Sequence, residues 1–137
     1  STDIVSATEH NARSFADNVR DELLSMQRLF FANGKPVVLA KNLVPVSLLA
    51  ISDQKIDGSL RIREIMKRYF NQDIAFVITE VSSSLSGENS DILGLETCDP
   101  LLNLKMTFYS IDNQILTIGD NYLNDDLIKL RLVQAWS

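Results

Sequence analysis

The chain of 137 residues has little of what disulfide scaffolds, Cys/His metal centres and basic nucleic-acid surfaces require. With one cysteine and one histidine, it cannot form an internal disulfide, and a Cys/His metal site would need carboxylates to complete it. The net charge is −5, whereas binders of polyanionic nucleic acid usually present a basic face. No apolar run approaches the roughly 20 residues that cross a bilayer, and no charged-then-apolar leader opens the chain. The composition argues against DNA contact by this chain and against a membrane partner, and it favours the cytoplasm.

Motifs for catalysis are equally scarce. His10 and Cys98 could be paired as base and nucleophile, but neither stands in a recognisable motif, and Cys98 is interpreted as a small filler. The five glycines form no phosphate-binding loop of the Walker or dinucleotide type. Most acidic residues fall in expected turns, where an aspartate bonds to its own backbone. The sequence therefore predicts no enzyme activity, no metal and no cofactor.

Hydrophobic patterning predicts a single α+β domain over residues 1–137, with residues 1–8 frayed. Turn residues such as Asn33-Gly34 and Asp112-Asn113 separate the apolar segments, and short loops force antiparallel neighbours. Because both faces of 73–85 are largely apolar at its start, that segment is expected to be a central, covered strand. The result is a mostly antiparallel six-stranded sheet, with strands at 22–32, 36–44, 73–85, 101–111, 114–123 and 127–134 and short helices at 9–20, 60–70 and 88–95.

One helix start points to a ligand. Ser59 is predicted to cap the helix at 60–70, and the free N–H groups of a helix N-terminus attract anions. Arg61 and Arg63 lie in its first turn, where a cation opposes the helix dipole unless an anion lies nearby. Arg28 is a cation in an apolar strand, where a charge is costly unless it meets solvent or a partner. Two plainer interpretations stay open: Arg28 extends to solvent, and Ser59 only caps its helix.

The hairpin Met26–Pro45 resembles the first hairpin of UTRA domains, the effector-binding domains of the HutC subfamily of GntR-type transcription regulators. Arg28, the stretch Ala32–Pro36 and the closing Leu43–Pro45 stand where that hairpin has its arginine, its Ala-Asp-Gly-Glu-Pro turn and its aromatic-X-Pro end. Gly58-Ser59-Leu60 is similar to the family's Gly-Ser-Leu helix start. The resemblance continues through the central strand, an Ala-X-X-Leu-like helix and the closing meander, and it covers about 22–134.

This resemblance implies a chorismate-lyase-like fold, a homodimer and a small-molecule effector bound against the sheet. It further implies that DNA is contacted by a separate winged helix-turn-helix domain that is not in this chain. The chain would then be the ligand-sensing and dimerisation domain of a bacterial regulator. The positions that match the family's effector pocket are Arg28, Ser59, Arg61, Thr117 and Tyr122.

Departures from the family pattern bear on the ligand. Phe30, Ala40 and Thr117 stand where the sugar-phosphate binders have an arginine, a glutamate and a polar or acidic residue. Loss of these groups argues against a phosphosugar and favours a less polar or differently charged effector, or a degenerate site.

Two alternatives stay open. Val44–Leu49 also resembles the end of the first hairpin in chorismate pyruvate-lyases, which share the fold. Met26 and Ile118, however, stand where those enzymes have the arginine and the glutamate that hold the dicarboxylate substrate. A buried dicarboxylate without its cation is strongly disfavoured. The second alternative is a dimerisation domain without any ligand.

Overall fold

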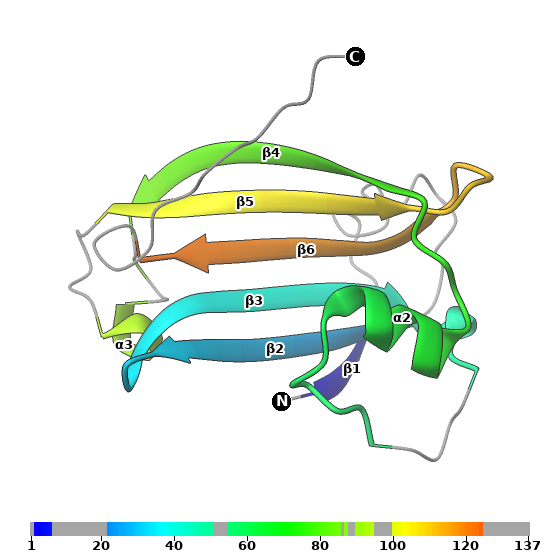
Figure 1. The fold of residues 1–137 in the computed structure, drawn as a ribbon, viewed down its shortest axis with the longest axis horizontal. Helices are drawn as coiled ribbons and strands as arrows, with labels where there is room; N and C mark the ends of the chain where they lie inside the picture. The colour runs from blue at the N-terminus through cyan, green and yellow to red at the C-terminus, as the bar shows by residue number, and fades with distance from the viewer. Residues whose placement is uncertain are drawn as a thin grey trace.

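A single antiparallel sheet organises the computed structural model, which describes residues 2–6, 22–50, 55–85, 87, 90–94 and 100–124. The strand order is β1-β2-β3-β6-β5-β4 (Figure 1). The helical elements in the described ranges are a 3-10 turn η1 (Val46–Leu48) and the helices α2 (Ile62–Phe70) and α3 (Ser90–Leu93). The strands are β1 (Thr2–Ser6), β2 (Glu22–Ala32), β3 (Lys35–Pro45), β4 (Phe76–Leu85), β5 (Pro100–Tyr109) and β6 (Ile115–Leu123).

The predicted α+β class and antiparallel pairing are confirmed, but the predicted set of six strands is not. Five of the expected strands are present as β2 to β6. The expected strand at 127–134 and the expected helix at 9–20 lie outside the described residues. The prediction of frayed residues at 1–8 is wrong for Thr2–Ser6, which pairs with Glu22–Met26 of β2 as β1. A hydrophobic pattern of five residues is too short to predict a strand. A strand this short is stable only through pairing with its neighbour.

The first hairpin follows the prediction closely. Asn33 and Gly34 connect β2 to β3 with φ values of 52° and 76°, which is the backbone that a two-residue hairpin turn requires. A second turn at Asp112-Asn113 connects β5 to β6, and there Asn113 has a φ of 62°. Short turns with asparagine or glycine at the left-handed position thus fix both registers, as the sequence indicates.

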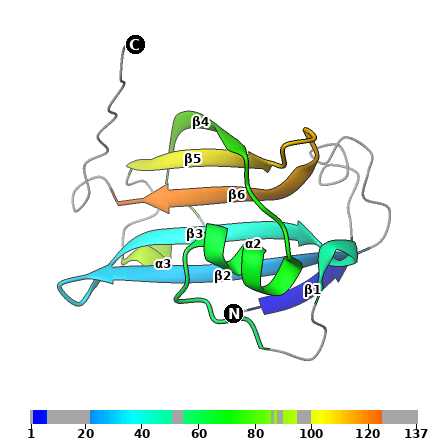
Figure 2. The ribbon, with the colours of Figure 1, turned by 45° about the vertical axis from the view of Figure 1, so that its right-hand side comes forward.

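Helix α2 covers the β2 and β3 side of one sheet face (Figures 1 and 2). The apolar stripe of α2 packs against the inward side chains of β2 and β3, in a core formed by Leu24, Met26, Val44, Ile65, Met66, Tyr69 and Phe70 together with Leu116. Burial of this stripe supplies most of the stability of a nine-residue helix, which would be marginal by itself. On the opposite face, Leu93 of α3 packs with Leu39 and Leu101.

Tyr69 also fixes the loop that leads into α2. The backbone N–H of Asp57 donates to the Tyr69 hydroxyl oxygen at 3.0 Å. The backbone N–H of Ala50 donates to the Tyr69 carbonyl oxygen at 2.9 Å. One residue of the helix therefore holds the connection from η1 at two points.

Strand β4 corrects the sequence analysis. It begins at Phe76 and lies at the end of the strand order, so within the described sheet it is an edge strand and not a covered central one. Phe76 and Ile78 on one face are 42% and 50% exposed, and Val77 and Val81 on the other are 41% and 53% exposed. Apolar residues on both faces indicate that something covers both faces, but they do not say whether the cover belongs to the same chain.

Candidate functional site

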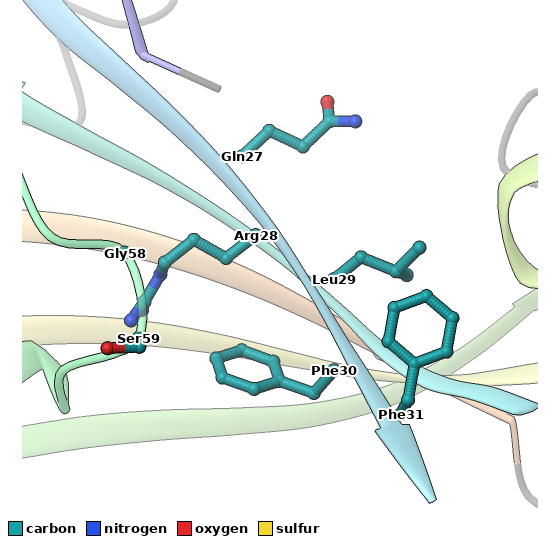
Figure 3. A pocket seen from close by; sticks show the side chains of 7 residues that line it. All are labelled: Gln27, Arg28, Leu29, Phe30, Phe31, Gly58 and Ser59. Carbon is teal, nitrogen blue, oxygen red and sulfur yellow. The ribbon is translucent and has the colours of Figure 1, made fainter. Parts of the chain in front are cut away.

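The candidate site is a pocket at the outer part of β2, close to the loop before α2. Strand β1 pairs only with Glu22–Met26, so the segment Gln27–Ala32 of β2 has no strand on its outer side among the described residues. The pocket has a volume of about 480 Å³, and its lining residues are Gln27, Arg28, Leu29, Phe30, Phe31, Gly58 and Ser59 (Figure 3). Alternation along the strand sends Arg28 and Phe30 to the α2 face and their neighbours to the other face.

Arg28 is the cation of this pocket. Its Nη1 donates to the Leu60 carbonyl oxygen at 2.9 Å, and its Nη2 donates to Asn42 Oδ1 at 3.2 Å. The Phe30 ring lies 5.4 Å from the guanidinium carbon, within cation–π range. The Nε atom is buried and has no hydrogen-bond partner. The plain alternative, an arginine that extends into solvent, does not describe this side chain.

The charge of Arg28 is not neutralised within the described part of the chain. Both acceptors of the Arg28 guanidinium, the Leu60 carbonyl oxygen and Asn42 Oδ1, are neutral. Desolvation by burial lowers the pKa of Arg28, which nonetheless stays protonated at neutral pH. A half-buried cation with neutral acceptors and an unpartnered N–H is suited to receive an anionic group.

Ser59 lies in the pocket but does not cap α2, so that prediction is wrong. The N-cap position is Arg61, which makes no capping hydrogen bond with its side chain. Instead Ser59 closes a turn: its backbone N–H and its hydroxyl both donate to Asp57 Oδ1, at 3.0 and 2.6 Å. The hydroxyl bond first and the N–H bond second lower the pKa of the Asp57 carboxyl group. The two donors of Ser59 are therefore occupied by an aspartate.

The remaining predicted site residues are not brought into the pocket lining. Arg61 is exposed at the helix start. Thr117 is fully buried and donates to the Leu43 carbonyl oxygen at 2.8 Å. Tyr122 pairs with Leu39 and Asn103, its ring lies 5.6 Å from Lys41 Nζ, and by register it faces the side of the sheet opposite to Arg28. Arg28 and Ser59 are the two predicted residues that line one pocket.

Sequence reasoning missed Phe31 and Asn42. Phe31 is 61% exposed and forms an apolar wall of the pocket. Asn42 is 4% exposed and holds the guanidinium of Arg28. The sequence did hold a signal for Asn42: it is an amide in a largely apolar strand, and a buried amide needs a hydrogen-bond partner. That partner comes from the neighbouring strand, so only the register of the hairpin identifies it.

The described residues limit the chemistry of the site. They contain no group of three or more histidine, cysteine or acidic side chains placed to hold a metal ion. Among them no helix has the length and the apolar character that spanning a bilayer demands. The pocket lining combines the Arg28 cation, the Phe30 and Phe31 rings and the Ser59 hydroxyl, which is hydrogen-bonded to Asp57.

Comparison with known proteins identifies the domain. Residues 1–129 match the model of the UTRA domain family, so the chain belongs to the UTRA domain family. No curated protein matches the chain by sequence.

Solved structures agree on the fold. The effector domain of PhnF from Mycobacterium smegmatis superposes with a TM-score of 0.87 at 14% identity, over 99% of this chain and 84% of that chain. The complete PhnF protein gives a TM-score of 0.88 at 14% identity, over 100% of this chain and 61% of that one. A GntR-family transcriptional regulator from Enterococcus faecalis V583 gives 0.85 at 15% identity, over 98% and 96%. At such identities the likeness establishes the fold and not the ligand.

Proposed function

We propose that this UTRA domain senses a small organic anion and controls DNA binding by a winged helix-turn-helix domain outside this chain. It would serve a cytoplasmic, bacterial GntR-type regulator of the HutC subfamily and would not act as an enzyme. The observation that carries the proposal is Arg28, a half-buried cation that lines a pocket and has neutral acceptors only. The fold of the GntR-family relatives supports the regulatory context.

The ligand we infer is an oxyanion attached to an apolar body. Arg28 supplies one positive charge, and the ring of Phe30, which is 38% exposed, lies 5.4 Å from its guanidinium carbon. Phe31 lines the pocket from the other side of β2 and is 61% exposed (Figure 3). An exposed aromatic ring beside a cation favours a carboxylate or phosphate on a flat apolar group over a polyhydroxylated sugar. Phe30 stands where the sugar-phosphate binders have a second arginine, and this agrees with that preference.

The test is binding of three probes to the purified chain: benzoate, phenyl phosphate and inorganic phosphate. A ligand of the folded state raises the melting temperature by mass action. Arg28→Ala should weaken binding about tenfold to a hundredfold, since a hydrogen bond to a charged group contributes roughly 1.5–3 kcal/mol. Arg63→Ala is the matched control, because Arg63 is exposed on α2 and does not line the pocket. Binding that is unchanged in Arg28→Ala would overturn the site.

Dimerisation is the second part of the proposal. The edge strand β4 exposes four apolar side chains, Phe76, Val77, Ile78 and Val81, and has a single strand neighbour in the described part of the sheet. A strand edge without proline or lysine readily pairs with another copy of itself. We infer a two-fold dimer in which β4 pairs with β4 and the sheet continues across the axis.

A further inference from the structure

Asn42 is a buried amide in a strand whose other inward residues are apolar. It is 4% exposed, and by register it lies between Met26 of β2 and Gly119 of β6. Its Oδ1 accepts the hydrogen bond from Arg28 Nη2 at 3.2 Å. This bond comes from a residue two positions further along the same face of β2, so Asn42 fixes where the guanidinium lies along the strand.

Gly119 makes room for this amide. A Cβ atom at position 119 would lie 2.7 Å from Asn42 Nδ2, a distance that real Cβ contacts essentially never show. Gly119 has no positive φ, so the glycine is needed here for space and not for its backbone conformation. The two strands next to each other, β3 and β6, therefore shape a slot that holds the Asn42 side chain against Arg28.

Asparagine and aspartate have side chains of nearly the same shape, and the residue at position 42 is the uncharged one of the two. An aspartate has the same size and would offer the same acceptor oxygen, but it would bring a negative charge to the guanidinium. The other acceptor of Arg28, the Leu60 carbonyl oxygen, is neutral as well. Both partners thus orient the cation and leave its charge available.

We propose that Asn42 is the specificity-determining residue of the pocket: it positions Arg28 without neutralising it, so that the ligand's carboxylate or phosphate supplies the counter-ion. This rests on the proposed function. A neutral ligand can form hydrogen bonds with Arg28 no stronger than those it forms with water. An oxyanion also gains the attraction of a half-buried positive charge that is paired with no described carboxylate. The residue acts through Arg28 and is a positioning residue.

Asn42→Asp is the decisive variant, measured with benzoate and phenyl phosphate at pH 7. The new carboxylate should occupy Arg28 and reduce probe affinity by about tenfold or more. At the same time the melting temperature of the free protein should rise, because a buried cation gains its counter-ion. A merely structural role for Asn42 gives the opposite pattern, a lower melting temperature with unchanged affinity of the folded protein.

Acidification supplies a second measurement on the same variant. The charged group that contacts position 42 among the described residues is Arg28, flanked by Met26 and Gly119 on the neighbouring strands. Protonation of the carboxylate introduced by Asn42→Asp should therefore restore the binding of phenyl phosphate, which keeps a negative charge in acid where benzoate does not, and should remove the gain in melting temperature at the same time. The control is Asn113→Asp, the same chemical change on the exposed β5–β6 turn, which should alter neither.

The outcomes separate this inference from the proposed function. If the wild-type protein binds a probe and Asn42→Asp binds it equally well, the role of Asn42 is wrong and the pocket stands. If the wild-type protein binds no probe, the anion pocket and this inference are both overturned. If Asn42→Asp does not fold, Asn42→Ser still decides, because a neutral side chain too short to hold Arg28 should lower affinity without an acid-dependent recovery.

Discussion

The outer part of β2 (Gln27–Ala32) and the edge strand β4 are both strand segments with one strand neighbour in the described structure, yet they carry opposite chemistry. The β2 segment presents a cation beside the loop of α2, and its charge meets two neutral acceptors. β4 presents apolar side chains on both faces and one charged residue, Glu80. The difference shows that two edges of one sheet can carry unlike chemistry, and it is the basis on which we propose an anion for the first edge and a second sheet edge for the other.

The largest expected effect compares a phenylalanine of the core with one on the edge strand β4. Phe70, the last residue of α2, is 1% exposed in the core, whereas Phe76 is 42% exposed on β4 and stacks on Tyr109 with ring centroids 4.7 Å apart. Phe70→Ala should lower the free energy of unfolding by about 3–5 kcal/mol through the cavity it leaves. Phe76→Ala should cost about 0.5–1.5 kcal/mol. Urea denaturation of both variants measures the difference, and equal losses would mean that β4 is as well covered as the core.

The dimer prediction tests the apolar edge directly. Ile78→Lys places a charge at the centre of β4 and should convert a dimer into a monomer in sedimentation velocity at micromolar concentration. Ile111→Lys is the matched control, since Ile111 is 85% exposed on the β5–β6 turn and lies off the edge. A strictly monomeric wild-type protein, or a dimer that persists in Ile78→Lys, would refute pairing through β4.

Two glycines sharpen the description of the pocket. Gly119→Ala forces a Cβ atom against Asn42 and should cost about 1–3 kcal/mol, as over-packing typically does. Gly58→Ala brings a Cβ atom to 3.7 Å from Arg28 Cδ and Cγ, an ordinary contact, and should change stability by less than about 0.5 kcal/mol. Thermal unfolding compares them. A tolerated Gly119→Ala would show that the slot around Asn42 is not tight.

The smallest effect belongs to the exposed turn at Asp57. Hydrogen bonds from Ser59 lower the folded-state pKa of Asp57, so their stabilisation is present above the unfolded pKa and disappears as the pH falls through the folded one. The difference in melting temperature between wild type and Asp57→Asn should therefore shrink below about pH 4. A difference that stays constant across that range would show that the turn does not depend on the carboxylate.

Local chemistry made most of the fold predictable. Asn33-Gly34 and Asp112-Asn113 stand in turns whose backbone needs those residue types, and the apolar stripe of α2 follows helical spacing. The edge position of β4 was not predictable. A strand covered by its own chain and a strand covered by a second copy have the same apolar residues on both faces.

The site was predictable only in part. Arg28 stood out as a charge in an apolar strand, and the structure keeps it in a pocket with Ser59. Asn42 and Gly119 act through pairing between β2, β3 and β6, which brings together residues far apart in sequence. Ser59 was misjudged because Asp57 competes for the same donors, and a sequence does not show which acceptor wins.

The hydrogen bond at the Tyr69 hydroxyl links the loop that lines the pocket to helix α2. The segment Asp57–Leu60 is tied to α2 by the Asp57 N–H bond to Tyr69 and to the sheet by the Leu60 carbonyl bond to Arg28. A ligand that draws the guanidinium toward itself pulls on the same short stretch of backbone that enters the first turn of α2. The position of the Arg28 side chain and the position of the start of α2 are therefore linked through the backbone of Asp57–Leu60.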